Sequence, residues 1–92
     1  MKVSIITVAY NSGSCMARTI ESVLAQTAGG IEYMIIDGAS KDRTVEVAES
    51  YRAAMEKRQI EYHIFSEPDN GIYDAMNKGI RLATGDVIGF LN

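Results

Sequence analysis

The sequence predicts an α/β protein with a mainly parallel sheet of about four strands that is flanked by helices. Short apolar runs rich in β-branched residues alternate with stretches of helical periodicity, and the connections between them are short. Strands and helices that alternate in this way form parallel sheets through right-handed crossovers. The 92 residues, of which 47% are hydrophobic and 23% charged, suit one small globular domain.

Two different periods predict the first strand and the first helix. Residues 3–9 are apolar apart from Ser4 and Thr7, as expected of a strand that is covered on both faces. The next apolar positions fall on one face of a helix: Met16, Ile20, Val23 and Leu24. We expect this helix to end at the Gly29–Gly30 pair, because glycine often terminates helices.

Residues 31–37 form the second predicted strand, and a second helix follows it. The apolar stripe of this helix comprises Val45, Ala48, Met55 and either Tyr51 or Arg52. Either Asp42 or Thr44 is expected to cap its start. Residues 60–66 alternate and are rich in β-formers, which predicts a third strand.

The last predicted helix begins beside a sequence that also suits a hairpin. Asn70-Gly71 is a strong signal for a tight β-turn, but the residues after it have helical rather than alternating spacing. Their apolar stripe comprises Ile72, Met76, Ala83 and either Gly79 or Ile80. We therefore expect a helix that ends at Thr84–Gly85 and a fourth strand over residues 86–91.

The composition argues against several classes of function. A net charge of −3 with no run of Lys or Arg argues against nucleic-acid binding. Cys15 is the one cysteine, so no internal disulfide forms and a reducing compartment fits. No apolar run is long enough for a membrane span, and residues 3–9 make a poor signal peptide, so we expect a cytoplasmic protein. Cys15 and the single His63 are expected to have structural or surface roles, with no zinc site.

Small and polar residues gather where the predicted strands end. In open α/β sheets, ligands bind beyond the carboxyl ends of the strands. The first three strands deliver these residues to that edge: Thr7, Ala9, Tyr10 and Asn11; Asp37, Gly38 and Ser40; Ser66, Glu67 and Asp69. A tyrosine ring can stack on a nucleotide base, and a carboxylate can accept hydrogen bonds from a base or a ribose. Neither the dinucleotide fingerprint nor the Walker loop is present.

A structural interpretation stands beside the functional one at Asp37 and at the pair Asp74 and Asn77. Asp37 precedes a glycine, so its spacing suits a turn as well as a ligand contact, and the two remain open. Asp74 and Asn77 share the polar face of the last predicted helix with Lys78 and Arg81. Such a face is by itself typical of a solvated helix surface with one weak ion pair.

Four segments, in order and spacing, resemble the N-terminal nucleotide-binding half of family 2 glycosyltransferases: VSIITVAYN, IIDGASKDRT, SEPDNGIYDAMNKGI and ATGDVIGFLN. The resemblance covers essentially all 92 residues and implies a Rossmann-like sheet of the GT-A type. The third segment looks most like bacterial enzymes that build O-antigen, capsule or exopolysaccharide. The implied activity of the full-length enzyme is hexosyltransferase-like, from a UDP-sugar to an acceptor hydroxyl, with inversion.

The resemblance also implies the contacts of the donor nucleotide. Six positions match the motifs that surround it: Thr7, Ala9, Tyr10, Asp37, Asp74 and Asn77. Among them, Asp37 is expected to bond the edge of the uracil, while Asp74 and Asn77 border the nucleotide pocket.

The same resemblance implies what residues 1–92 lack. In the family, FLN runs directly into an acidic motif that binds Mn²⁺ or Mg²⁺ on the donor diphosphate, and the catalytic base lies further on. We therefore expect residues 1–92 to be a donor-binding subdomain truncated at its C-terminal side, with no metal ligand and no catalytic residue. The metal ligands and the half that binds a glycan or lipid-linked acceptor would lie beyond Asn92. Such a fragment would bind nucleotide but be inactive, and the full-length enzyme would be cytoplasmic or peripheral at the inner membrane.

Two rival interpretations belong to other classes. A flavodoxin-like or receiver-like regulatory module would share the fold, but a receiver domain needs a cluster of acids after its first strand, where AYNSGS has none. A nucleotidyltransferase needs a basic, glycine-rich loop at the same place, where Arg18 is the nearest basic residue.

Overall fold

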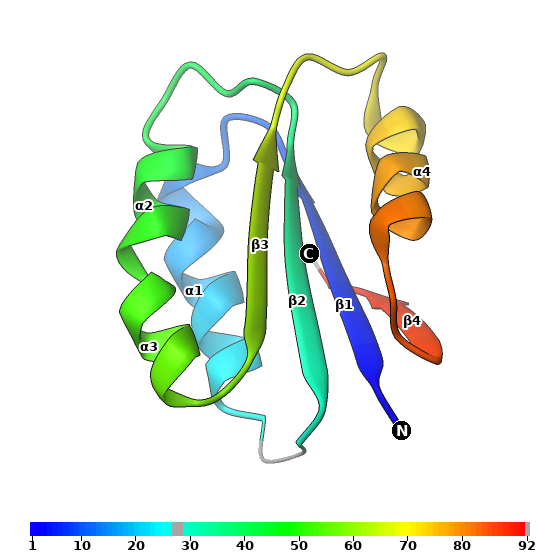
Figure 1. Ribbon diagram of the computed structural model, residues 1–92. Helices are drawn as coiled ribbons and strands as arrows, with labels where there is room; N and C mark the ends of the chain where they lie inside the picture. The colour runs from blue at the N-terminus through cyan, green and yellow to red at the C-terminus, as the bar shows by residue number, and fades with distance from the viewer. Residues whose placement is uncertain (27–28, 92) are drawn as a thin grey trace.

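The structure is a computed structural model that describes residues 1–26 and 29–91 (Figure 1). Strands and helices alternate along these residues: β1 (Val3–Ala9), α1 (Gly13–Leu24), β2 (Ile31–Asp37), α2 (Thr44–Ser50), α3 (Arg52–Lys57), β3 (Glu61–Ser66), α4 (Ile72–Leu82) and β4 (Val87–Phe90). The predicted α/β class is therefore confirmed, and each strand lies within a residue or two of its predicted bounds.

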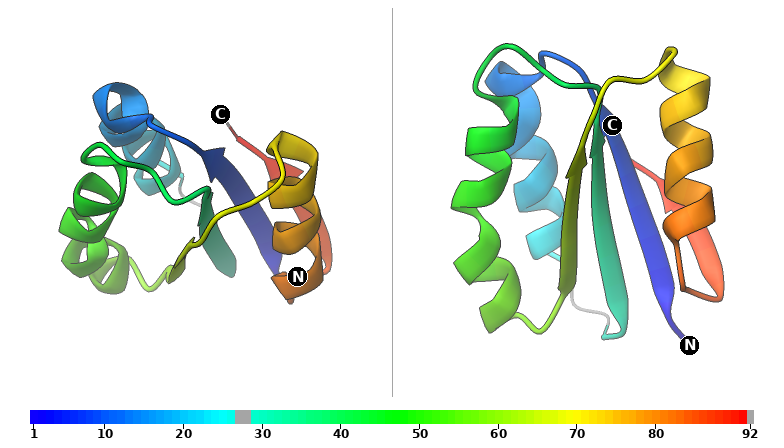
Figure 2. Two further views of the ribbon diagram at one scale, coloured as in Figure 1. Left: turned by 90° about the horizontal axis from the view of Figure 1, so that it is seen from above. Right: turned by 45° about the horizontal axis from the view of Figure 1, so that its top comes forward.

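The strands of the described residues form one parallel sheet in the order β3-β2-β1-β4. α1, α2 and α3 cover one face of this sheet and α4 covers the other, as the view from above in Figure 2 shows. β1 pairs with β2 until Ala9 lies opposite Asp37, and Asp37 lies opposite Ser66 of β3. The carboxyl ends of these three strands therefore meet at one edge, as the sequence predicted.

The central strand β2 divides the hydrophobic core into two parts. Every residue of β2 is buried, because helices cover both of its faces. Tyr33 and Ile35 belong to the cluster that includes residues of α1, α2 and α3, whereas Met34 and Ile36 pack with Ala75 of α4. Burying an isoleucine side chain stabilises a fold by about 1.5–3 kcal/mol, so the alternation of β2 fixes which face receives which helix.

The predicted end of the first helix is wrong. α1 ends at Leu24 rather than at the Gly29–Gly30 pair, and residues 27–28, just before that pair, lie outside the described part. The guanidinium of Arg58 donates hydrogen bonds to the carbonyl oxygens of Leu24 and Gln26. A side chain thirty-four positions away thus satisfies a carbonyl that a further helical turn would otherwise bond.

The predicted second helix is two shorter helices, α2 and α3, that meet at Tyr51. The hydroxyl of Ser50 donates to the carbonyl of Val47 at 2.6 Å, and that carbonyl would be the helical partner of the Tyr51 N–H. The Tyr51 N–H bonds instead to the carbonyl of Ala48 at 3.3 Å. Local competition by a serine therefore interrupts the helical ladder.

The alternative at Asn70-Gly71 is decided in favour of the helix, since α4 follows directly. Gly71 has a backbone φ angle of 110°, a value that residues with a Cβ rarely adopt. This conformation lets the chain turn sharply into the helix. Further along α4, a Cβ on Gly79 would lie 2.8 Å from Cγ2 of Ile6. The missing side chain of Gly79 therefore allows α4 to pack closely on β1.

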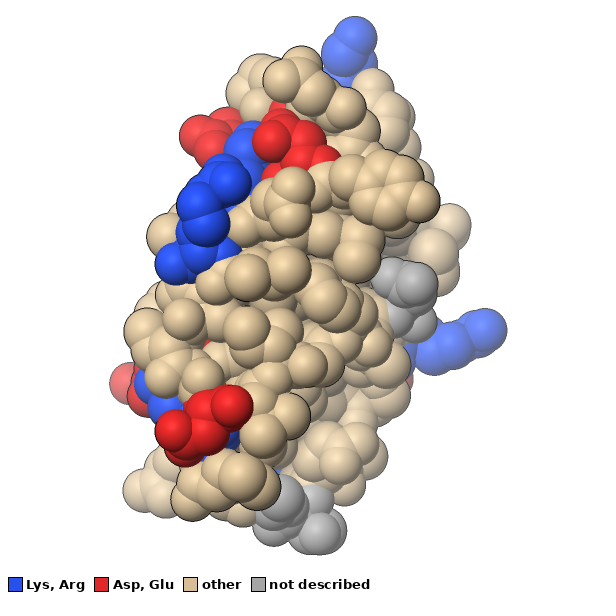
Figure 3. All heavy atoms as spheres, turned by 90° about the vertical axis from the view of Figure 1, so that its right-hand side faces the viewer, with Lys and Arg blue, Asp and Glu red and all other residues tan. Residues whose placement is uncertain are grey.

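The side of the molecule formed by α4 and β4 exposes apolar side chains. Figure 3 faces this side, and its middle carries no charged side chain. Exposed apolar residues of the two elements are Ile72, Tyr73, Ile80, Leu82, Val87, Ile88 and Phe90. Across the described ranges, none of the helices combines the length and the apolar character that crossing a bilayer requires.

Candidate functional site

A pocket of about 440 Å³ opens at the edge where the strands end. Its lining residues come from the ends of β1, β2 and β3 and from the start of α4: Val8, Ala9, Tyr10, Gly38, Pro68, Asp69, Gly71, Ile72 and Ala75. The volume lies within the usual range for a small-molecule site. Of the sequence-predicted contacts, Ala9 and Tyr10 line the pocket, and the Tyr10 side chain is exposed.

Thr7 lies below the pocket rather than in its wall. It is buried, and its hydroxyl donates to the carbonyl of Leu91 at 2.8 Å. Because that bond uses its only proton, the Tyr33 hydroxyl, 2.8 Å away, donates to Thr7 in turn. Burial raises the pKa of Tyr33, which keeps this phenol protonated. Thr7 therefore ties β1 to β2 and to the segment after β4, and direct contact with a ligand stays a prediction.

Asp37 is buried, with 1% of its surface exposed, and its carboxylate accepts several hydrogen bonds. Oδ2 accepts the Ser40 N–H at 2.9 Å and the Ser66 hydroxyl at 2.8 Å, while Oδ1 accepts the Ser40 hydroxyl at 2.5 Å. The Ser40 hydroxyl in turn accepts the Asn11 N–H at 2.7 Å. Asp37 thus organises the loops after β1, β2 and β3, and it is absent from the pocket wall. Its contact with a uracil stays a prediction.

Asp74 and Asn77 lie on α4, but neither lines the pocket. Oδ2 of Asp74 accepts the Asn70 N–H at 2.9 Å and lies 3.8 Å from the Lys78 ammonium. The same ammonium lies 3.2 Å from Glu67. Asp74 therefore shapes the turn into α4, and the predicted nucleotide contacts of Asp74 and Asn77 stay predictions.

Asp69 is the carboxylate in the pocket wall, and it was not among the six predicted contacts. Its Oδ1 accepts the Gly71 N–H at 3.1 Å. Its Oδ2 faces Gly38 so closely that a Cβ on this glycine would lie 2.9 Å away. Two features of the sequence could have indicated this contact: an acidic residue, Asp69, follows the third strand, and a glycine, Gly38, follows the second.

Asp42 organises the neighbouring helix starts. Its Oδ2 accepts the Gly13 N–H at the start of α1, and its Oδ1 accepts the Thr44 N–H at the start of α2, each at 3.0 Å. Hydrogen bonds from the Thr44 hydroxyl and from these N–H groups lower the pKa of Asp42. The negative charge of Asp42 stabilises the N-terminal ends of both helices, where the helix dipole is positive.

Comparison with known proteins identifies the family. A model of glycosyl transferase family 2 matches residues 4–92. The chain belongs to glycosyl transferase family 2. An uncharacterised glycosyltransferase of Mycobacterium tuberculosis is 43% identical over 91 residues, which are 98% of this chain and 32% of the relative. A PGL/p-HBAD biosynthesis glycosyltransferase of Mycobacterium bovis is 36% identical over 88 residues, which are 96% of this chain and 33% of the relative.

The chain therefore spans about a third of the length of the curated family 2 relatives it matches. Solved structures agree on the fold. TarS 1–349 of S. aureus in complex with UDP-GlcNAc has a TM-score of 0.84 at 22% identity, over 98% of this chain and 26% of that chain. A mannosyltransferase of Pyrobaculum calidifontis in complex with GDP-Man and Mn²⁺ has the same TM-score and identity, over 95% and 26%. The Rossmann-like sheet of the GT-A type is confirmed, and family membership decides against the two rival classes.

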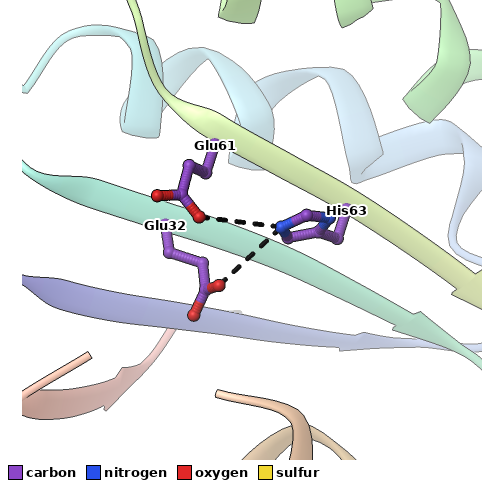
Figure 4. A group of neighbouring side chains, drawn as sticks. All are labelled: Glu32, Glu61 and His63. Atoms are coloured by element: carbon purple, nitrogen blue, oxygen red, sulfur yellow. Dashed lines mark ion pairs between the residues drawn. The ribbon is translucent and has the colours of Figure 1, made fainter. Parts of the chain in front are cut away.

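The family resemblance implies Mn²⁺ or Mg²⁺, and such an ion prefers carboxylate and other oxygen ligands. Within the ranges 1–26 and 29–91, one group brings three potential ligand atoms within 4.8 Å: Glu32, Glu61 and His63. Figure 4 shows these side chains pointing toward one another from β2 and β3. The Lys2 ammonium, 3.0 Å from Glu61, already supplies a positive charge there.

The place of this cluster also does not fit a donor metal. Glu32 is the second residue of β2, and Asp37 is the seventh, so the cluster lies roughly 16 Å from the strand end at about 3.3 Å per residue. An ion there would be too far from a diphosphate whose nucleoside occupies the pocket. No catalytic step is therefore assigned to Glu32, Glu61 or His63.

Proposed function

We propose that this chain is the donor-binding part of a family 2 glycosyltransferase that uses a UDP-sugar in the synthesis of a bacterial surface polysaccharide. The observation that supports it most directly is the pocket where β1 and β2 end, with the exposed Tyr10 ring in its wall. Stacking on an aromatic ring contributes about 1–3 kcal/mol per base. The small residues Ala9 and Gly38 leave room for a nucleoside to approach the backbone.

In the proposed reaction, the acceptor hydroxyl oxygen bonds to the anomeric carbon of the sugar from the face opposite the nucleotide. The bond between that carbon and the β-phosphate oxygen breaks, UDP leaves with the electron pair, and the acceptor proton passes to a base. Inversion follows from this single displacement. We assign the base, the Mn²⁺ or Mg²⁺ ligands, and the contacts of the glycan or lipid-linked acceptor to parts of the enzyme outside this chain, which would work in the cytoplasm or at the inner face of the membrane.

Calorimetric titration of the chain with UDP tests this proposal. We expect a Kd on the order of 10⁻⁴ M, since one nucleoside pocket buries little of a charged diphosphate, and little change on adding Mn²⁺. Tyr10→Ala should weaken UDP binding about tenfold through the loss of stacking. Tyr73→Ala is the matched control, because Tyr73 is exposed on α4 and does not line the pocket.

Three outcomes would contradict the proposal. The first is the absence of UDP binding at millimolar concentration. The second is an equal loss of affinity in Tyr10→Ala and Tyr73→Ala. The third is stronger binding of a nucleoside triphosphate or of acetyl phosphate than of UDP, because a pocket for a UDP-sugar should prefer UDP.

A further inference from the structure

Lys78 of α4 is held more closely than a lysine on a solvated helix surface. Its side chain is only 17% exposed. The ammonium donates a hydrogen bond to the carbonyl oxygen of Pro68 at 3.1 Å, and it lies 3.2 Å from Oε1 of Glu67 and 3.8 Å from Oδ2 of Asp74. An ammonium has three protons, so this set of three oxygens can use all of them. The pair with Asp74 alone would stabilise the helix only slightly, but the other two contacts reach outside the helix.

The outside contacts of Lys78 fall on residues 67–71, which form the wall segment. This segment connects β3 to α4 and contributes Pro68, Asp69 and Gly71 to the lining of the pocket. Proline has no N–H, so its carbonyl is the one main-chain group through which a hydrogen bond can hold it. The ammonium of Lys78 therefore fastens a residue of the pocket wall to the second turn of α4.

Lys78 itself does not line the pocket. It lines a second cavity of about 410 Å³, to which Ser66 and Glu67 also contribute. The chain passes from the lining of the second cavity to that of the first between Glu67 and Pro68. Lys78 thus reaches the wall segment from a different cavity, and it can affect a ligand in the pocket through this segment.

We propose that Lys78 is a positioning residue of the donor site, whose ammonium holds the wall segment in the conformation that receives the nucleotide. This inference rests on the proposed function. A segment that is already ordered loses less conformational entropy when a ligand binds, and the affinity is correspondingly higher. Removal of the ammonium should therefore weaken binding although no group that contacts the ligand is lost.

NMR titration of the chain and its variants with UDP tests this role. Lys78→Met removes the charge and keeps an unbranched side chain of good helix propensity. It should bind UDP about threefold to tenfold more weakly, because binding then has to order the wall segment. Lys78→Arg still offers charged donors to Pro68 and should bind UDP within about twofold of the unaltered chain. Lys78 lies at the molecular surface, so we expect both variants to fold, and circular dichroism checks this.

Arg52→Met is the matched control. Arg52 makes corresponding contacts on α3: it pairs with Glu49, three residues earlier, and donates to the carbonyl oxygen of Tyr62 at 3.3 Å. Its helix covers the face of the sheet opposite α4, and Arg52 does not line the pocket. Arg52→Met thus also removes an ion pair and a bond to a neighbouring carbonyl, but it should leave the UDP affinity unchanged.

The mobility of the wall segment gives a readout that needs no ligand. In the free chain, the ¹⁵N–¹H heteronuclear NOE of the Asn70 and Gly71 amides should fall in Lys78→Met, because this NOE reports motion on the picosecond-to-nanosecond timescale. It should stay unchanged in Arg52→Met. An NOE that is also unchanged in Lys78→Met would show that the ammonium does not hold the segment and would overturn the inference.

Uridine distinguishes positioning from an attraction between the Lys78 ammonium and the diphosphate. Uridine has no phosphate, so a role through the wall segment predicts about the same fold loss of affinity for uridine as for UDP in Lys78→Met. A loss confined to UDP would assign Lys78 to the diphosphate charge and overturn the inference.

The remaining outcomes separate this inference from the proposed function. An equal loss of UDP affinity in Lys78→Met and Arg52→Met would assign the effect to overall stability and overturn the inference alone. Unchanged UDP affinity in Lys78→Met would do the same, whether or not the wall segment becomes more mobile. Absence of UDP binding to the unaltered chain would overturn both proposals.

Discussion

Asp37 holds three loops together through one buried carboxylate. Its partners, Ser40 and Ser66, belong to the segments that follow β2 and end β3. Asp69, thirty-two positions later, is partly exposed, and within the described residues its carboxylate accepts one hydrogen bond, from the Gly71 N–H. The sequence placed both aspartates at the same sheet edge. It could not predict which would be buried, because that depends on side chains brought together from separate strands.

At this scale we predict that Asp37→Ala lowers the free energy of unfolding by about 2–4 kcal/mol. The substitution removes a charged acceptor of three part-buried hydrogen bonds, and each such bond contributes about 1 kcal/mol to stability. Ser66→Ala removes one donor and should cost about 1 kcal/mol. Urea unfolding measures both. A change in Asp37→Ala within about 0.5 kcal/mol would mean that the carboxylate does not stabilise the loops.

Among the elements, α4 depends most visibly on a single small residue. Its Gly79 is buried, and a Cβ there would lie 2.8 Å from Cγ2 and 3.0 Å from Cδ1 of Ile6. Both are atoms of a side chain with no exposed surface in the middle of β1, which cannot move aside without disturbing the smaller core cluster. The separation between α4 and the sheet is therefore set at this contact.

We predict that Gly79→Ala destabilises the fold by about 1 kcal/mol. Overpacking costs about 1–3 kcal/mol, and the better helix propensity of alanine offsets up to about 1 kcal/mol of that loss. Adding Ile6→Val removes the Cδ1 atom, so the double variant should lose less than the sum of the single losses. Gly89→Ala is the control, because its Cβ would meet no atom within 4 Å. Urea unfolding of the four variants checks this, and a stabilised Gly79→Ala would contradict the close contact.

The elements also show how far sequence reasoning reaches. Strand positions followed from apolar runs, because burial of β2 on both faces leaves a local signature. Helix ends were predicted less well, since Arg58 ends α1 from a distant helix end and Ser50 interrupts α2 through one side-chain bond. The pocket edge was predictable from topology. The space between Gly38 and Asp69 was not, because it exists only once β2 and β3 are side by side.

At the scale of the whole molecule, Glu32 connects segments that lie far apart in the sequence. This buried carboxylate accepts hydrogen bonds from the Ser4 hydroxyl at 2.7 Å and from the Thr84 N–H at 2.9 Å and hydroxyl at 3.0 Å. The Ser4 hydroxyl oxygen also accepts the Gly85 N–H at 2.9 Å. Burial would raise the pKa of Glu32, but these bonds and the Lys2 ammonium outweigh it and lower the pKa below 4.5. The Glu32 carboxylate of β2 thus connects β1 to the segment that precedes β4.

The sign of this pKa shift gives a prediction for acid stability. Because the folded state lowers the pKa of Glu32, the carboxylate stabilises the fold fully above about pH 4.5, and this contribution is lost as the pH falls below that value. Glu32→Gln should be less stable at neutral pH, and the gap to the unaltered chain should shrink in acid. Urea midpoints between about pH 3 and pH 7 measure it. His63, 3.7 Å from Glu32, and Glu61 face the same group, so His63→Gln and Glu61→Gln are tested in parallel.

A gap that stays constant down to about pH 3 would contradict the assignment to Glu32. None of the three variants, Glu32→Gln, Glu61→Gln and His63→Gln, alters a residue of the pocket wall.

The strand order has a consequence for the time course of synthesis. β1 leaves the ribosome before both of its neighbours in the sheet: β2, in which Ile31 pairs with Val3, is made first, and β4, in which Val87 pairs with Val3, is made much later. Until β4 is made, one edge of β1 offers its free N–H and C=O groups to any passing chain. These four strands cannot all pair before residues 87–90 exist. Premature termination ahead of β4 should therefore release a product that is prone to aggregate, whereas one that includes β4 has closed this edge.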